Sequence, residues 1–255
     1  MIECLYWEMF YNCNYNCSYC YEKQLKDYNL KKININSLKK TAQKIKEFIK
    51  YNNICKIGIL GGEVFILKKE DFIEILNILN TEELKEIEIV TNLSKPIEYY
   101  IDVINIFKNK KIILTCSFHY EQTDIHTFLS KIFNLKDTKA LIQIQLTLFN
   151  KTKKFVKILQ YFSKKIKVKV HFVKKFDFEN GVPKRTTVSK NPNFGKYCEQ
   201  SYITIRNNKI VATCFEQEIV NDFLSLDISK KLNYKIICKN DFCTLRDNNE
   251  YFEKI

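Results

Sequence analysis

The sequence predicts an α/β protein in which a parallel sheet is covered on its outside by helices. Apolar stretches of strand length alternate with amphipathic stretches of helix length between residues 2 and 172, a pattern typical of repeated strand–helix units. The chain has 255 residues, 45 % of them hydrophobic, so it can bury a large core. After residue 175 the alternation stops, and a small second unit is expected.

The expected strands are short stretches rich in Ile, Val and Leu, at residues 2–10, 56–60, 86–90, 111–118, 141–149 and 166–172. Apolar residues recur at helical spacing between them, at residues 38–51, 70–79, 96–108, 124–133 and 152–162. Ser37 is the expected N-cap of the first helix. Pro96 begins the third, where its missing N–H does no harm. Six strands that alternate with helices in this way predict a parallel sheet with helices outside it.

Segments whose residues could bind a ligand or take part in a reaction follow the first four strands. A cysteine-rich loop comes after the first, and Gly61, Gly62 and Glu63 come after the second. Thr91-Asn92 end the third, and residues 117–119, "SFH", end the fourth. Because the carboxyl ends of parallel strands meet at one edge of the sheet, we expect these segments to form one site.

The cysteine loop places Cys13, Cys17 and Cys20 within eight residues. A disulfide framework fits a chain of this length poorly, and the opening residues show no secretory leader. We therefore expect a cytoplasmic protein that uses these thiols for metal, either as a zinc knuckle or as a cluster site. No apolar run is long enough for a membrane span.

The charge of +13 is spread along helical faces and turns, so we interpret it mainly as a solvated lysine-rich surface. It nevertheless leaves open an alternative of another class, a basic zinc-binding protein that contacts nucleic acid. That alternative explains the cysteines and the charge. It gives no purpose to the strand–helix units or to Glu63, and it is therefore second choice.

The motif C-x3-C-x2-C after the first strand, together with Gly-Gly-Glu after the second, resembles the radical S-adenosylmethionine (SAM) superfamily. The resemblance covers residues 1–175 and implies a partial (β/α)6 TIM-like barrel. It implies that Cys13, Cys17 and Cys20 hold a four-iron, four-sulfur cluster whose fourth iron binds SAM. In this superfamily the reduced cluster cleaves SAM to a 5′-deoxyadenosyl radical, which abstracts a hydrogen atom from a substrate C–H bond.

The resemblance also implies cofactor contacts. Gly61 and Gly62 would let the backbone approach the ligand, and Glu63 would accept a hydrogen bond from the amino group of SAM. Tyr19 occupies the aromatic position near adenine, and Ser117 the position of a ribose contact. The remaining candidates in the barrel are Asn92 as a weaker cofactor contact, His119 as a substrate or cofactor contact with a tentative catalytic role, and His171 at the end of the last strand.

Residues 176–197 are expected to be a linker, and residues 198–255 a small cysteine-rich unit. Asn207-Asn208 predict a two-residue hairpin turn between two short strands. The surrounding cysteines are Cys198, Cys214, Cys238 and Cys243, a set that suits zinc or an iron–sulfur cluster. Their arrangement resembles the Twitch form of the SPASM auxiliary domain, which implies an auxiliary four-iron, four-sulfur cluster.

An auxiliary cluster favours net oxidation, or cross-linking, of a peptide or small metabolite. The resemblance implies a flavodoxin- or ferredoxin-type electron donor. Only twelve residues precede Cys13, so we expect no leader-binding domain there, which leaves open leader recognition by a separate leader-binding protein or a substrate that is not a peptide.

Overall fold

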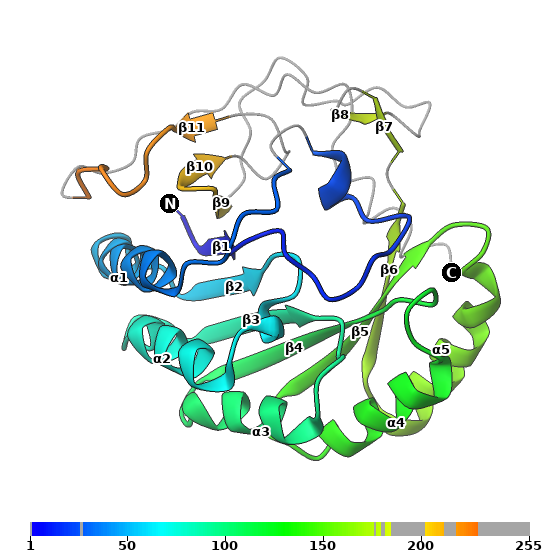
Figure 1. Ribbon diagram of the computed structural model, residues 1–255. Coiled ribbons are helices and arrows are strands. Elements are labelled where there is room, and N and C mark those ends of the chain that lie inside the picture. Colours follow the sequence, from blue (N-terminus) through cyan, green and yellow to red (C-terminus); the bar gives the residue numbers. More distant parts are fainter. Residues whose placement is uncertain are drawn as a thin grey trace.

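The computed structural model describes residues 2–25, 28–175, 177–179, 182–184, 202–211 and 218–228 (Figure 1). Its main feature is a nine-stranded sheet with the order β11-β10-β9-β1-β2-β3-β4-β5-β6. From β1 to β6 every neighbouring pair is parallel, and so is the pair β1–β9. The six-stranded partial barrel predicted from the sequence is therefore confirmed.

The barrel strands are β1 Cys4–Glu8, β2 Lys56–Leu60, β3 Glu86–Thr91, β4 Lys111–Phe118, β5 Leu141–Leu148 and β6 Lys169–Lys174. The helices are α1 Ile35–Asn52, α2 Lys69–Leu79, α3 Ile97–Ile106, α4 Ile125–Leu135 and α5 Lys153–Ile166. The single turns η1 Glu22–Gln24 and η2 Val64–Ile66 follow the cysteine loop and the glycine pair. All five α-helices lie on the convex side of the sheet, in an arc (Figure 1).

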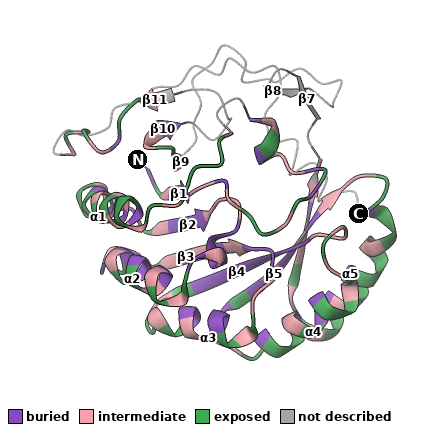
Figure 2. Ribbon diagram, viewed as in Figure 1, coloured by how far each residue is buried: buried purple, intermediate pink, exposed green. Residues whose placement is uncertain are grey.

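Side chains alternate between the two faces of each strand and thereby divide the core from the barrel interior. On β5, Ile142, Ile144 and Leu146 are buried in the core, and Gln143 and Gln145 alternate with them. The buried residues gather on the strands and on the helix faces turned toward them (Figure 2). The opposite face of these strands is left for polar side chains, which is where the site forms.

Two local expectations were wrong. The N-cap of α1 is Asn34, whose side chain accepts a hydrogen bond from the backbone N–H of Ser37, so Ser37 is the third helical residue and not the cap. The last barrel strand begins at Lys169 and not at Ile166. Ile166 still belongs to α5, and Lys167 ends that helix in the left-handed region with φ 59°.

The predicted hairpin is present as β9 Tyr202–Arg206 and β10 Lys209–Val211. Asn207 and Asn208 both have positive φ, 48° and 61°, as a tight two-residue turn requires. A third strand, β11 Glu218–Val220, pairs with β10. Since β9 pairs with β1, the hairpin continues the barrel sheet, and the boundaries proposed for a separate second unit stay a prediction.

Part of the expected linker is also strand. The segments β7 Asp177–Glu179 and β8 Val182–Lys184 pair as a two-stranded antiparallel sheet just beyond β6. The four cysteines expected to hold an auxiliary metal, Cys198, Cys214, Cys238 and Cys243, lie outside the described residues. Within the described ranges, none of the helices combines the length and apolar character that crossing a membrane demands.

Candidate functional site

A cavity of about 600 Å³ opens at the carboxyl ends of the barrel strands. It is lined by all three cysteines of the motif and by residues from β2, β3, β4, β5 and the segment after β6. Most of the side chains predicted from sequence meet here: Cys13, Cys17, Cys20, Tyr19, Gly61, Gly62, Asn92, Ser117 and His119. The expectation that the loops after the first four strands share one site therefore agrees with the geometry.

The cysteine loop presents its thiols to this cavity with backbone N–H groups beside them. The N–H of Tyr15 lies 3.3 Å from the sulfur of Cys13. Burial raises the pKa of the Cys13 and Cys17 thiols to about 11, so metal binding must displace their protons. The pKa of Cys20 is raised by burial, which the N–H groups of Lys23 and Glu22 at the start of η1 oppose.

The thiols of the cysteine loop suit an iron–sulfur cluster. Among the described residues, no group of three Cys, His, Asp or Glu side chains is arranged to hold one metal ion. An iron–sulfur cluster is itself several ångströms across and spaces its thiolate ligands more widely. Three cysteines with nearby N–H donors match the ligands that such clusters use.

Gly61 and Gly62 bring the turn after β2 against the backbone of the cysteine loop. A Cβ at Gly62 would lie 2.2 Å from the carbonyl oxygen of Asn12, and one at Gly61 would lie 2.5 Å from that of Phe10. Gly61 also has φ 142°, which L side chains rarely adopt. The N–H of Gly62 donates to the carbonyl of Phe10 at 2.8 Å. The close approach that requires glycine is thus made to the chain itself.

The Glu63 carboxylate is buried and accepts three hydrogen bonds from the protein. Its Oε1 accepts from the N–H of Phe65 at 3.0 Å and from the hydroxyl of Thr91 at 2.9 Å, and its Oε2 accepts from the N–H of Asn92 at 2.5 Å. The three hydrogen bonds lower the pKa of Glu63, but desolvation outweighs them and raises it to about 7. Glu63 therefore links the ends of β2 and β3, and contact with the amino group of SAM stays a prediction.

Asn92 connects this network to the cysteine loop. Its side-chain amide donates to Oδ1 of Asn14 at 2.9 Å and lies 3.7 Å from the sulfur of Cys13. Its own Oδ1 accepts from the N–H of Ser94 at 3.0 Å. Asn92 therefore supports the first cysteine as well as facing the cavity.

His119 lies against the second cysteine. Its Nδ1 is 3.5 Å from the sulfur of Cys17 and 3.1 Å from the hydroxyl of Tyr19. Burial lowers the pKa of His119 to about 4, so the imidazole is neutral at physiological pH. Tyr19 in turn packs its ring against Tyr120 at 5.7 Å and Phe149 at 4.9 Å. Tyr19 and His119 both line the cavity. Their predicted contacts with SAM or substrate stay predictions.

Sequence reasoning missed Glu121, which holds the cysteine loop from the β4–α4 connection. Its two oxygens accept hydrogen bonds from Ser18, one from the backbone N–H at 2.7 Å and one from the hydroxyl at 2.6 Å. Tyr120 donates to the same carboxylate at 2.9 Å. The only available sequence signal was the acidic residue two positions after His119.

The far wall of the cavity is polar. Ser117, Gln145 and Thr147 line it, and no residue in the described ranges hydrogen-bonds their side chains. Ser117 pairs in register with Gln145, which pairs with His171. His171 was expected to end the last strand and face the cavity, but β6 continues past it to Lys174. His171 alternates with the core residue Phe172 and so faces the barrel interior, yet it does not line the cavity.

Buried charge that the sequence pattern did not reveal lies beside the cavity, next to Glu22. Glu8 on β1 and Arg206 on β9 form an ion pair of 3.4 Å, although their side chains are only 8 % and 6 % exposed. Glu22 on η1 is 4 % exposed and also lines the cavity. Burial raises the pKa of Glu22 well above its ordinary value, and the Glu8 carboxylate adds to this.

A partial parallel barrel whose rim carries a thiol-lined cavity defines an enzyme that binds a metal cluster. Residues 7–143 match the model of the Radical SAM superfamily, which is more than half of the chain, and the chain belongs to this superfamily. Superfamily membership implies a four-iron, four-sulfur cluster and SAM, as the motif predicted.

A 7-carboxy-7-deazaguanine synthase from Clostridium acetobutylicum is similar to the chain, with 28 % identity over 159 residues. The aligned part covers 57 % of this chain and 66 % of that enzyme. The chain thus spans just under two thirds of the length of this relative.

Proposed function

We propose that the protein reductively cleaves SAM and abstracts a hydrogen atom from a C–H bond of a substrate held in the cavity. The observation that carries this proposal is the meeting of Cys13, Cys17 and Cys20 with Gly61 and Gly62 at one cavity on the barrel rim. Superfamily membership favours it over a zinc-binding protein that contacts nucleic acid.

We assign a separate role to each group of residues around the cavity. Cys13, Cys17 and Cys20 would hold the cluster, which when bound supplies the electron that breaks the bond between the SAM sulfur and C5′. Asn92 and Ser117 offer polar contacts to SAM from the ends of β3 and β4. The aromatic wall around Tyr19 excludes water, which protects a reactive radical from side reactions.

A small metabolite is our preferred substrate. A cavity of about 600 Å³ is within the range of small-molecule sites. The product named for the Clostridium relative, 7-carboxy-7-deazaguanine, is itself a small heterocyclic acid. We therefore favour oxidation of, or bond formation on, a small metabolite over cross-linking of a peptide.

Two further parts of the proposal concern electrons. Cys198, Cys214, Cys238 and Cys243 would hold an auxiliary four-iron, four-sulfur cluster that accepts an electron from the substrate radical. A flavodoxin- or ferredoxin-type protein of the cytoplasm would reduce the first cluster. Both follow from the resemblance stated for these residues.

Anaerobic purification followed by iron and sulfide analysis tests the proposal. Native protein should contain about eight irons per chain, and the triple variant Cys13→Ala/Cys17→Ala/Cys20→Ala about four. The double variant Cys238→Ala/Cys243→Ala should also fall to about four but keep SAM cleavage. Zinc without iron in the native protein would overturn the proposal, and four irons in native protein would overturn its auxiliary part alone.

A further inference from the structure

Cys17 is the buried cysteine of the motif. It is 5 % exposed, whereas Cys13 is exposed and Cys20 is partly exposed. Water therefore reaches the Cys17 sulfur less than it reaches the sulfur of Cys13, and hydrogen-bond donors to Cys17 have to come from the protein. Such donors matter in a buried place, because a polar group that is removed from water without a hydrogen bond is costly.

Two side chains offer donors to the Cys17 sulfur. Burial raises the pKa of the Cys17 thiol, and the hydroxyl of Tyr19, which is hydrogen-bonded to the sulfur, opposes that rise. The same hydroxyl oxygen lies 3.1 Å from Nδ1 of His119, and this Nδ1 lies 3.5 Å from the sulfur. Cys17, Tyr19 and His119 therefore form one hydrogen-bonded group.

The number of hydrogens decides which atom of this group donates. A phenol carries one hydrogen, and Tyr19 gives it to the Cys17 sulfur. Nδ1 of His119 can then bond to the hydroxyl oxygen only as a donor, so Nδ1 carries a hydrogen. The sulfur is within reach of that hydrogen as well. A neutral imidazole of this tautomer and a protonated imidazole both carry it.

The surroundings hold both donors in place. The backbone carbonyl of His119 accepts hydrogen bonds from the N–H groups of Gln122 and Thr123 at 3.0 and 3.1 Å, in the turn after β4. The ring of Tyr19 stacks on those of His119 and Tyr120, at 6.0 and 5.7 Å between centroids. Donors that packing fixes in this way need no rearrangement to reach a metal ligand.

We propose that Tyr19 and His119 donate hydrogen bonds to the Cys17 thiolate and thereby raise the reduction potential of the cluster that this thiolate would hold. The inference rests on the proposed function and deepens it, because it names the residues that control how readily the site accepts an electron. Hydrogen bonds to the sulfurs tune the potential of a cluster, and a donor stabilises the more negative, reduced state. Tyr19 and His119 act through Cys17 and are positioning residues in this role.

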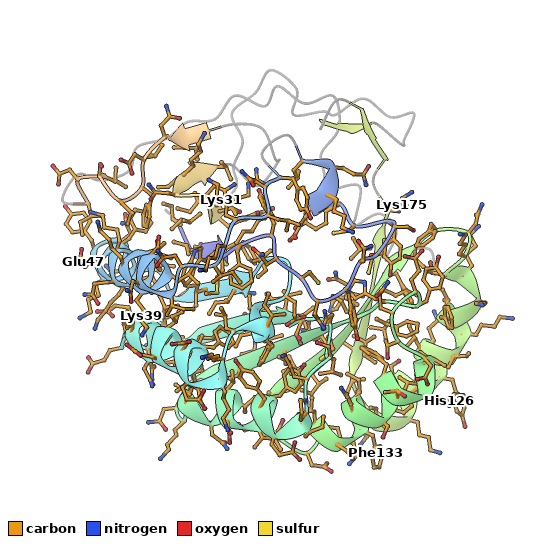
Figure 3. The ribbon with its side chains drawn as sticks, viewed as in Figure 1. Lys31, Lys39, Glu47, His126, Phe133 and Lys175 are labelled. Atoms are coloured by element: carbon orange, nitrogen blue, oxygen red, sulfur yellow. The ribbon has the colours of Figure 1, made fainter. Side chains whose placement is uncertain are left out.

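A redox titration of the anaerobic holoenzyme, monitored by electron paramagnetic resonance, measures this potential. The signal that changes when SAM is added belongs to the cluster of the cysteine loop and is the one followed. Tyr19→Phe removes the hydroxyl and keeps the ring. His119→Leu removes the imidazole donor, and His119→Asn offers an amide N–H near the place of Nδ1. His126→Leu removes an exposed imidazole from the outer side of α4 and is the matched control (Figure 3).

In Tyr19→Phe and in His119→Leu we expect the equilibrium of reduction to shift about tenfold toward the oxidised cluster, which is about 59 mV for one electron. His119→Asn should recover most of the shift, and His126→Leu should keep the native potential. Iron analysis checks that each variant holds its cluster. Tyr19→Phe removes a single oxygen atom, so it decides the question if His119→Leu loses iron.

Native or higher potentials in Tyr19→Phe and His119→Leu would overturn the inference. Equal shifts in His119→Asn and His119→Leu would also overturn it for His119, because the shift would then not depend on a donor. Failure of the proposed function is seen separately, as native protein that holds no iron or whose resonance signal does not respond to SAM.

Discussion

Gly62 lies so close to Asn12 that a side-chain carbon on the glycine would be 2.2 Å from the asparagine carbonyl oxygen. The atoms that such a carbon would meet are backbone atoms, so the cysteine loop itself would have to move. The turn after β2 and the loop after β1 are therefore built as one unit. This relationship explains why a glycine pair accompanies a cysteine motif in this barrel.

Gly62→Ala should displace the cysteine loop and lower the iron content of purified protein. Overpacking costs about 1–3 kcal/mol, and here it would destabilise the native position of the cysteine loop. Gly58→Ala is the matched control, because a Cβ there would meet the ring of Tyr6 inside the barrel and not the loop. Equal iron losses in both variants, measured per folded protein, would contradict this prediction.

Glu121→Gln should make the cluster labile without unfolding the barrel. The substitution removes the charge from the hydrogen bonds that Ser18 donates at 2.7 and 2.6 Å. We expect iron release to a chelator to become about 2- to 10-fold faster. Asp124→Asn, which alters the N-cap of α4 and leaves Ser18 untouched, should release iron at the native rate. Similar release from Glu121→Gln and native protein would show that the carboxylate does not hold the loop.

Arg206→Met should lower the free energy of unfolding by about 3–5 kcal/mol, because Glu8 would stay buried after losing its ion pair with the guanidinium. The double variant Glu8→Gln/Arg206→Met removes the stranded charge and should recover part of this loss. Chemical denaturation of the three proteins gives the comparison. If the double variant is no more stable than Arg206→Met alone, the ion pair between β1 and β9 does not account for the loss.

Glu63→Gln should change the stability little at low pH, because an amide and a protonated carboxyl each turn one hydrogen-donating group toward the donors that Glu63 now accepts from. The pKa of Glu63 is raised to about 7 in the folded state from an ordinary value of 4.5. Its contribution to stability is thus full below about pH 4.5 and is lost as the pH rises through 7.

The melting temperature of native protein should therefore fall relative to that of Glu63→Gln as the pH rises from 4.5 to about 7. A difference that stays constant over this range would mean that the three hydrogen bonds hold the pKa of Glu63 low.

The sequence was sufficient for the barrel because its strands carry an unambiguous alternation, with Ile142 and Ile144 toward the core and Gln143 between them. It was also sufficient for which loops meet, since that follows from parallel topology. The sequence did not predict which contacts the side chains of these loops make. Whether Glu63 faces a ligand or its own backbone depends on how the loops after β2 and β3 fit together.

Long-range pairs were likewise beyond the sequence pattern. Glu8 and Arg206 are 198 positions apart and meet only because β9 pairs with β1. Glu22 looks like a solvated charge in "YEKQ" until η1 places it in the cavity wall. Asn34 and Ser37 are equally good helix caps in sequence, and only the backbone decides between them.

The most direct test of the central claim is formation of 5′-deoxyadenosine from SAM by dithionite-reduced protein without oxygen. Native protein and Cys55→Ala, which removes an exposed thiol away from the cavity, should both form the nucleoside. Cys17→Ala should form none. Nucleoside formation by Cys17→Ala at the native rate, or no formation by native protein that contains its iron, would contradict the assignment of this cavity to radical chemistry.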